Sequence, residues 1–419
     1  MAGSGKKVVI IGAGFGGLAA AKALADMAVE VTIIDKNNHH LFQPLLYQVA
    51  TAGLNPSDIA APVRRILAKQ ENCRPILAEV TAIDKEAEQV ITSVGPFDYD
   101  YLILATGATH AYFGNDHWEE HAPGLKSIED ALDIRRRILL AFERAELTED
   151  PDERERLMTF VVVGAGPTGV EMAGAIREIA TRTLKQDFHR IDTTTQSQVL
   201  LIEAGPAVLP PFPTKLQRSA NDQLAHMAVD IRTDTRVTDI SDEGVTTTKG
   251  FIPAATVVWA AGVAASPLGE GLGGEIDRAG RAVVGHDLSL AGHPNVFAIG
   301  DVASVTDGEN KSVPGVAPAA EQGGQHVVKC IEADLEGTTR PTFIYKDKGS
   351  MATIGRSKAV AMIGDKVQFG GYAAWALWGL VHVASLIGFR SKVRTMSNWV
   401  WQYLTDQRSA RLITGDDVH

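Results

Sequence analysis

The sequence predicts an α/β fold with two parallel-sheet units, because one pattern occurs in it twice. Residues 8–11 and residues 160–163 are short apolar runs rich in β-branched side chains, as is typical of buried parallel strands. Each run is followed at once by a glycine-rich turn and then by a helical stretch. The chain has 419 residues, 45% of them hydrophobic, so it can bury the cores of two or three domains.

The composition excludes several classes of protein. The formal net charge is −11, which argues against a general nucleic-acid-binding protein. Cys73 and Cys330 lie far apart in the sequence, so we expect no disulfide framework, no redox-active cysteine pair and no zinc cluster. His39 and His40 are expected as polar turn residues, and no metal site is predicted.

The first copy of the pattern is a complete dinucleotide-binding fingerprint. Gly12 allows a tight turn, Gly14 lets a pyrophosphate approach the backbone, and Gly17 lets the helix pack closely on the strand. A helix over residues 18–27 follows, and its N-terminus offers free N–H groups to phosphates. Asp35 ends the next strand, where its carboxylate can accept hydrogen bonds from ribose hydroxyls. These features together predict a Rossmann unit.

The second copy has the same parts. Gly164, Gly166 and Gly169 precede a helix predicted over residues 170–187, and Glu203 ends the following strand. No arginine or lysine lies beside Glu203, so the 2′-phosphate of NADPH would meet a carboxylate without a cation. The sequence therefore favours NADH.

Two dinucleotide sites in one chain imply two dinucleotides. Reduced nicotinamide donates two electrons, and a flavin is its natural partner. A further apolar strand ends at Gly300 and Asp301, and an aspartate there could bind flavin hydroxyls. Two matching turns, at Gly107 and Gly262, each follow a strand after one of the fingerprints.

With these motifs the chain resembles the flavoproteins that have two dinucleotide-binding domains. The resemblance implies an FAD-binding domain of residues 1–125 and 276–340, interrupted by an NADH-binding domain of residues 126–275, and a C-terminal domain of residues 341–419. It implies that FAD binds to Gly12, Gly14, Phe15, Gly16, Gly17, Asp35, Lys36, Val80, Thr106, Gly107, Asp301, Ala317 and Pro318. It implies that NADH binds to Gly164, Gly166, Pro167, Thr168, Gly169, Glu203 and Gly262.

The C-terminal region suggests a membrane surface. Residues 367–389 carry no charged side chain, but a helix over 372–387 would be about 24 Å long, shorter than a bilayer core of about 30 Å. We therefore expect a buried or interfacial helix, with a membrane-spanning helix as the alternative. Beyond it, five apolar side chains recur at helical spacing: Val393, Met396, Val400, Tyr403 and Leu404.

Charge and tryptophan content support this interpretation. Residues 390–411 contain five basic residues and one acidic residue, giving +4, so the rest of the chain carries −15. Trp399 and Trp401 flank the apolar face, and Asn398 lies opposite to it. Such a helix is typical of membrane surfaces, and a core-packing amphipathic helix is the alternative.

Two further segments resemble the type II NADH:quinone oxidoreductases. Residues 39–50, HHLFQPLLYQVA, are similar to a segment near the flavin in that family, and residues 314–322 are similar to its quinone-site helix. In that helix Ala317, Ala320 and Gln322 match the family pattern, whereas Pro318 replaces a glutamine. Proline suits the first turn of a helix. Gln322 is the residue expected to donate a hydrogen bond to a quinone carbonyl, and a capping or solvated amide is the alternative.

The resemblance implies an FAD-dependent enzyme that passes a hydride from NADH to FAD and two electrons to a membrane quinone, without proton pumping. It implies a peripheral, monotopic protein on the cytoplasmic face of the bacterial membrane, bound to the inner leaflet through C-terminal helices. A homodimer is expected because dimers are common among such proteins. Two other functions stay open: a soluble reductase for an iron–sulfur protein, and a redox sensor that binds FAD and NADH.

Glu171 is the second residue expected to act in the reaction. It lies in the first turn of the second fingerprint's helix, where the helix dipole alone favours an acid. The superfamily resemblance implies instead that it positions NADH or relays protons to the quinone.

Ser127 and Asp130 predict a capping box that opens a helix to Leu147. Residues 148–156 are expected to be a charged linker.

Overall fold

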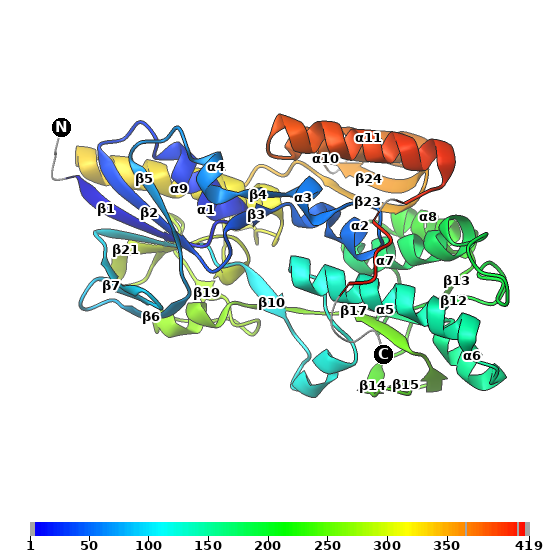
Figure 1. The fold of residues 1–419 in the computed structure, drawn as a ribbon. Helices are drawn as coiled ribbons and strands as arrows, with labels where there is room; N and C mark the ends of the chain where they lie inside the picture. The colour runs from blue at the N-terminus through cyan, green and yellow to red at the C-terminus, as the bar shows by residue number, and fades with distance from the viewer. Residues whose placement is uncertain (1–4, 365–366, 409, 415–419) are drawn as a thin grey trace. The chain divides into compact units, whose positions relative to one another are not determined.

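The computed structural model describes residues 5–364, 367–408 and 410–414, which divide into two compact units (Figure 1). Unit 1 comprises residues 5–41, 60–109 and 263–348. Unit 2 comprises residues 42–59, 110–262 and the described residues from 349 onward. The boundaries predicted at 125/126 and 275/276 lie near the crossings at 109/110 and 262/263. The sequence did not indicate that residues 42–59 and the C-terminal segment pack with unit 2.

Unit 1 is built on a six-stranded sheet that contains the first fingerprint. Its strands, in spatial order, are β20 (Ser289–Leu290), β21 (His293–Ala298), β9 (Tyr101–Leu104), β1 (Lys6–Ile11), β2 (Val29–Asp35) and β5 (Cys73–Leu77). All neighbours are parallel except β20 and β21. The buried β1 side chains explain why its apolar run is unbroken.

Two helices of unit 1 cross at a point where only glycine fits. Helix α1 (Phe15–Ala23) lies beside α9 (Ala317–Glu336) (Figure 1). A Cβ atom on Gly324 would lie 2.3 Å from the carbonyl oxygen of Gly16, so any side chain would separate the two helices. Helix α1 ends at Ala23, earlier than the predicted residue 27, because residues 24–27 form tighter turns.

The smaller elements of unit 1 surround this sheet. They are β3 (His39–Leu41), β4 (Ala60–Pro62), α4 (Val63–Ile66), the antiparallel sheet β6 (Val80–Asp84), β7 (Gln89–Thr92) and β8 (Gly95–Asp98), then β18 (Val263–Ala265), η4 (Pro267–Leu272), β19 (Ala282–Val283), η5 (Gly300–Val302) and β22 (Ala303–Ser304). β10 (Ala108–His110) leads from unit 1 into unit 2. His40 is a buried strand residue, so its prediction as a polar turn residue was wrong.

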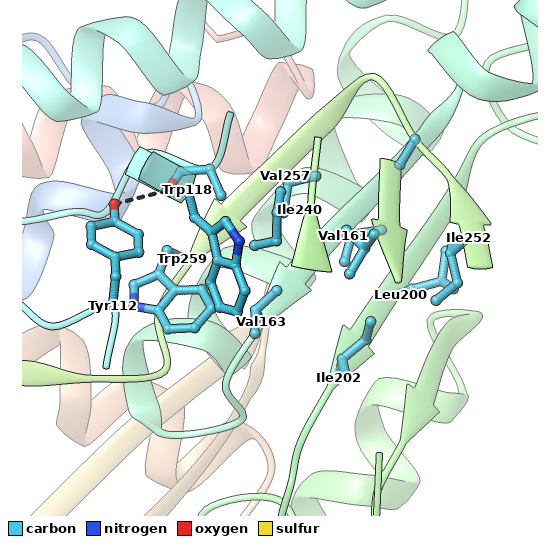
Figure 2. Close-up of a cluster of buried hydrophobic side chains, with 13 residues drawn as sticks. Tyr112, Trp118, Val161, Val163, Leu200, Ile202, Ile240, Ile252, Val257 and Trp259 are labelled. Carbon is cyan, nitrogen blue, oxygen red and sulfur yellow. Dashed lines mark hydrogen bonds between the residues drawn. The ribbon is translucent and has the colours of Figure 1, made fainter. Parts of the chain in front are cut away.

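Unit 2 contains the second fingerprint in a four-stranded parallel sheet. The strand order is β13 (Val229–Arg232), β12 (Gln198–Ile202), β11 (Thr159–Val163) and β17 (Thr256–Trp259). At one end of its core, Tyr112, Trp118 and Trp259 gather beside the aliphatic side chains of the sheet (Figure 2). The aromatic residues hold the loop after β10 against the end of β17, since the Trp259 Nε1 atom donates to the Ala111 carbonyl oxygen at 2.9 Å.

Helices and hairpins complete the body of unit 2. They are η1 (Gln43–Leu45), α2 (Leu46–Ala50), α3 (Pro56–Ile59), η2 (Asp116–Glu120), α5 (Ile128–Leu147), α6 (Pro151–Leu157), α7 (Pro167–Glu178), the π-helix η3 (Ile179–Thr183), α8 (Thr214–Ala225), β14 (Val237–Ile240), β15 (Gly244–Thr247) and β16 (Gly250–Pro253). The predicted capping box at Ser127 and Asp130 is confirmed. The predicted linker 148–156 was wrong in part, because Asp150 caps a helix that Pro151 begins.

The C-terminal segment also belongs to unit 2. It consists of an antiparallel sheet, β23 (Ser350–Gly355), β24 (Lys358–Ile363) and β25 (Val367–Gly370), followed by α10 (Tyr372–Ser385) and α11 (Phe389–Thr405) (Figure 1). It is fixed to the sheet-bearing part at Gly174 of α7, where a Cβ atom would lie 1.7 Å from the Ile354 carbonyl oxygen. None of the described helices combines the length and apolarity needed to cross a membrane.

Candidate functional site

The first glycine turn has the geometry that the fingerprint predicts. Gly12 has a φ of +99°, and a Cβ atom on it would lie 2.4 Å from the Ala105 carbonyl oxygen. A Cβ atom on Gly17 would lie 1.9 Å from the Gly12 carbonyl oxygen. Gly14 instead faces open space, with no atom within 4 Å of such a Cβ position. Gly12 and Gly17 therefore fix the turn, and Gly14 leaves the space in which a ligand can approach the backbone.

Asp35 ties this turn to the end of β2. Its two carboxylate oxygens accept the backbone N–H groups of Ala13 and Asn37, both at 2.7 Å. An ionised carboxylate has about four lone-pair sites, so acceptor positions remain for ribose hydroxyls. His40 supports the turn from the other side, with Nδ1 2.9 Å from the Ala13 carbonyl oxygen. The sequence offered no signal for this role, because His40 is brought here by the short pairing of β3 with β4.

The second glycine turn repeats this geometry in unit 2. Gly164 has a φ of +98°, and a Cβ atom on Gly169 would lie 1.8 Å from the Gly164 carbonyl oxygen. Gly166 faces open space, as Gly14 does. The Glu203 carboxylate accepts the N–H groups of Ala165, at 2.8 Å, and Gly205, at 2.7 Å. The second fingerprint therefore places its acid beside the glycine turn, as the first one does.

The helices that follow the two glycine turns, and helix α9, start without a side-chain cap. Gly14 precedes α1, Gly166 precedes α7 and Val316 precedes α9, and none of these residues has a side chain that caps the helix. The first N–H groups of a helix need partners, and the dipole favours an anion there. Pro167 begins α7, three residues before the predicted start of that helix at residue 170, and Pro318 is the second residue of α9 rather than the first. The starts of α1 and α7 therefore suit the pyrophosphate of a dinucleotide.

The predicted FAD residues fit a flavin nucleotide in a further way. They all lie in unit 1, and the Thr106 hydroxyl oxygen among them is buried without a hydrogen-bond partner in the described part of the chain. Gly107, the next residue, has a φ of +67° and open space beside it. A buried hydroxyl without a partner is costly, so a ligand that supplies one fits this position. Gly300 and Asp301 line a small cavity that the start of α9 also borders.

The remaining predicted cofactor residues are placed as follows. Phe15 begins α1 and Val80 begins β6, while Lys36 is exposed just after Asp35. All the predicted NADH residues lie in unit 2, with Thr168 exposed in the first turn of α7. Gly262 follows β17, on the side of β11 opposite to Glu203. Each predicted set thus falls within a single unit.

Glu171 lies in the second turn of α7, not in the first as predicted, because the helix already begins at Pro167. Its environment favours the neutral form of the carboxyl group. Burial raises the pKa of Glu171 to about 8, although a long hydrogen bond from the Thr353 backbone N–H, at 3.4 Å, acts in the opposite direction. Tyr47 lies near enough that the Glu171 charge adds to the burial that raises its own phenol pKa. A carboxyl group with a pKa near 8 is largely protonated at neutral pH and can donate a proton.

Gln322 is half-buried in the second turn of α9, and both ends of its amide are engaged. Its Nε2 atom donates to the Lys346 carbonyl oxygen and its Oε1 atom accepts the Lys346 N–H, each at 3.0 Å. A glutamine amide has two N–H donors, so one of them is left after this pairing. The side chain is therefore held in one orientation by the backbone of Lys346.

Comparison with known proteins identifies the family. Residues 6–324 match the pyridine nucleotide-disulphide oxidoreductase family, and residues 348–407 match the NDH2 C-terminal domain. The chain is 48% identical to the type II NADH:quinone oxidoreductase Ndh of Mycobacterium tuberculosis, over 97% of this chain and 90% of that protein. It is 32% identical to the type II NADH:quinone oxidoreductase of Staphylococcus aureus, over 90% and 94%. The chain belongs to the type II NADH:quinone oxidoreductases.

Solved structures agree on the fold. NDH2 from Plasmodium falciparum, solved in complex with NADH, superposes with a TM-score of 0.88 at 20% identity and covers 98% of this chain and 100% of that one. The predicted fold class, family, enzyme class and cofactors, FAD and NADH, are confirmed. The predicted reaction of a type II NADH:quinone oxidoreductase, from NADH through FAD to a quinone, is confirmed as well, and the absence of proton pumping stays a prediction.

This type II NADH:quinone oxidoreductase departs from the disulphide chemistry in its family's name. Cys73 and Cys330 are both free. Burial raises the pKa of the Cys73 thiol to about 11 and that of the Cys330 thiol to about 12, so both are protonated at neutral pH. A protonated thiol is a poor nucleophile, and neither side chain is suited to thiol chemistry.

Proposed function

We propose that FAD binds to the first glycine turn and NADH to the second, through the residues that the sequence predicts for each. FAD, when bound, accepts the hydride of NADH and passes two electrons to the quinone. The observation that carries the assignment is the repeated geometry of the two turns. In each, two glycines fix the backbone, one glycine faces open space, and a carboxylate at the strand end accepts two N–H groups.

Glu203 favours NADH over NADPH. Its carboxylate is held beside the glycine turn by the N–H groups of Ala165 and Gly205. The following residues are alanine, glycine and proline, so a 2′-phosphate would find a negative charge and no basic partner from this strand end. Ribose hydroxyls, in contrast, can donate to that carboxylate.

Glu171 and Gln322 are proposed to act on protons and on the quinone. With a pKa of about 8, Glu171 holds a proton that the quinone needs as it is reduced. Gln322 has one amide N–H that its pairing with Lys346 does not use, and this group can donate to a quinone carbonyl. Both roles require positioning and electrostatics, without a covalent nucleophile.

We also propose that α11 binds the chain to the surface of the cytoplasmic membrane leaflet. Its polar side faces inward: Asn398 donates to Asp58 at 3.1 Å, Trp399 donates to Gln48 at 2.7 Å, and Gln402 donates to the Gly53 carbonyl oxygen. The five apolar residues predicted to form one face are all exposed: Val393, Met396, Val400, Tyr403 and Leu404. A helix that is held by hydrogen bonds and exposes its apolar face suits a membrane interface rather than core packing.

The nucleotide assignment can be tested with Gly166→Ala. Because Gly166 has extended backbone and faces open space, alanine fits the fold and interferes only with a bound pyrophosphate. We expect the KM for NADH to rise about tenfold or more, equivalent to about 1.4 kcal/mol, with FAD content and melting temperature unchanged. Gly271→Ala is the matched control, since Gly271 also faces open space. An unchanged KM would contradict the proposed NADH site.

The membrane proposal can be tested with Leu404→Glu. Leu404 is 76% exposed on α11, and Leu147, 74% exposed at the end of α5, provides the control Leu147→Glu. We expect Leu404→Glu alone to weaken flotation with anionic phospholipid vesicles, while NADH oxidation with a water-soluble quinone stays unchanged. Equal flotation of both variants would exclude this face of α11 as the membrane-binding surface.

The chain is also proposed to form a homodimer, as expected from the family resemblance. Sedimentation equilibrium of the wild-type protein tests this proposal.

A further inference from the structure

Phe113 combines exposure with an unusual backbone conformation. It is 69% exposed and has a φ of +54°, and Gly114, the next residue, has a φ of +86°. A bulky residue with positive φ is rare and costs free energy, and such residues gather at ligand sites. Neither property serves to bury a core, so this phenylalanine is a candidate for a binding role.

The Phe113 ring covers the turn at the end of β17. A Cβ atom on Gly262 would lie 2.6 Å from the Phe113 Cζ atom, so a larger residue would displace the ring from this position. The ring also contacts Trp259 edge-on, with centroids 6.2 Å apart. Tyr112 stacks on the same Trp259 at 5.2 Å, among the aromatic residues of Figure 2. The neighbours of Phe113 are thus fixed in the core, and the ring is presented on a rigid support.

The turn at Gly262 borders the crevice in which NADH is proposed to bind. A Cβ atom on Gly164 would lie 2.5 Å from the Ala261 Cα atom, so the second glycine turn and the residue before Gly262 are in direct contact. The crevice runs across the carboxyl end of β11. Glu203, for the adenosine ribose, follows β12 on one side of β11, and β17 lies on the other side. The nicotinamide half of NADH is therefore directed toward the end of β17 and Phe113.

We propose that the Phe113 ring packs against the nicotinamide–ribose half of NADH and is a binding residue for this substrate. This proposal rests on the NADH site proposed above. The ring supplies an apolar surface that shields one side of the substrate from water, and its support holds it in place before binding. The matching position in unit 1, Gly107, has no atom within 4 Å of a Cβ position, so only the second turn carries such a cover.

The test compares four variants of the full-length holoenzyme: Phe113→Ala, Phe113→Asn, Phe113→Tyr and Phe251→Ala. Asparagine tolerates positive φ, so it removes the ring without backbone strain. Phe251 is a half-exposed phenylalanine on the hairpin strand β16 and serves as the control. We expect the alanine and asparagine variants to raise the KM for NADH and the dissociation constant of NAD⁺, measured calorimetrically, about 3- to 10-fold.

Several other properties of these variants provide controls. The quinone KM and FAD content should not change, the melting temperature should not fall, and the tyrosine and Phe251 variants should bind NAD⁺ like the wild type. Wild-type NAD⁺ affinity in Phe113→Asn, alongside weakened binding in Gly166→Ala, would overturn the role of Phe113 and leave the proposed site intact. Wild-type affinity in both variants would overturn the proposed NADH site itself. A change in quinone KM alone would assign the ring to the quinone and overturn the proposal.

Discussion

The two glycine turns are built alike, yet we propose that one holds a resident cofactor and the other a substrate that must leave. Gly12 and Gly164 have φ values of +99° and +98°, and both strand-end carboxylates accept two N–H groups at 2.7–2.8 Å. The turns differ where their neighbours differ. The position of Ala19 in α1 is taken by Glu171 in α7, and the open turn at Gly107 corresponds to the covered turn at Gly262.

The elements that pack against the two fingerprint helices, α1 and α7, differ as well. Helix α1 packs against α9, with Gly324 close to the backbone of Gly16, whereas α7 packs against β23 through Gly174. The shared part of each unit consists of backbone groups and one carboxylate, which is the part proposed to recognise a dinucleotide. The parts that are not shared carry what distinguishes a flavin site from a nicotinamide site. Variants at matching positions can separate these two contributions.

The largest effect is expected from Gly17→Ala and Gly169→Ala. In each variant the new Cβ atom would lie less than 2 Å from the carbonyl oxygen of Gly12 or Gly164, so the turn must open. We expect Gly17→Ala to lose bound FAD and Gly169→Ala to keep FAD but lose NADH oxidation by more than about 100-fold, or about 2.7 kcal/mol. Flavin absorbance of the purified proteins and stopped-flow reduction by NADH measure the two losses. FAD loss in both variants would show that the turns do not act separately.

Glu171→Gln tests the residue that replaces an alanine of the first unit. We expect quinone reduction to fall about 10- to 100-fold, since the amide cannot donate the proton, while the rate of flavin reduction by NADH stays within about twofold. The wild-type rate of quinone reduction should decline as pH rises through about 8, where Glu171 loses its proton, and the variant should lack this decline. A pH–rate profile with the same limb in both proteins would assign it to another group.

The same substitution changes how stability depends on pH. Because the pKa of Glu171 is raised to about 8, the folded chain holds this proton more tightly than the unfolded chain. The free energy of unfolding should therefore fall as pH rises from the ordinary value of a glutamic acid toward 8. Thermal unfolding of wild type and Glu171→Gln between pH 5 and 9 should show a gap that widens with pH in favour of the variant. A constant gap would exclude a raised pKa.

The dinucleotide turns could be predicted because their signal is local. Glycines at fixed spacing, an apolar strand and a terminal acid lie within one stretch of chain, so the sequence determines Gly12, Gly14 and Gly17 together. The apolar face of α11 was predictable for the same reason, from helical periodicity alone. The polar partners on its inner side were not, since Gln48, Gly53 and Asp58 lie about 350 residues earlier in the chain.

The missed features depend on contacts between distant segments. His40 supports Ala13 only after β3 pairs with β4, and Phe113 meets Gly262 across about 150 residues. The pairing of Gln322 with Lys346 likewise needs the chain to return beside α9. In the linker that proved helical, the charges obscured the signal, although Asp150 and Pro151 provide a cap and a helix start.

A smaller effect is expected from Glu203→Gln. The amide keeps one acceptor oxygen but removes the negative charge that would repel a 2′-phosphate. We expect the preference for NADH over NADPH, as the ratio of kcat/KM values, to fall about tenfold, equivalent to about 1.4 kcal/mol. Asp35→Asn is the matched change in the first unit and should lower FAD affinity without altering this ratio. An unchanged ratio in Glu203→Gln would assign the discrimination to another element.

The smallest effect should come from Thr106→Val, which removes the buried hydroxyl that finds no partner in the described part of the chain. The second unit has Ala261 at the matching position, so a hydroxyl is not needed to form such a turn. Valine has nearly the shape of threonine, and the FAD-free protein should be at least as stable as the wild type. FAD affinity, measured by fluorescence during reconstitution, should fall about fivefold, the loss of one hydrogen bond of about 1 kcal/mol. Unchanged affinity would mean that the hydroxyl does not face the cofactor, and the first turn would then bind FAD through backbone and carboxylate alone, as is proposed for NADH at the second turn.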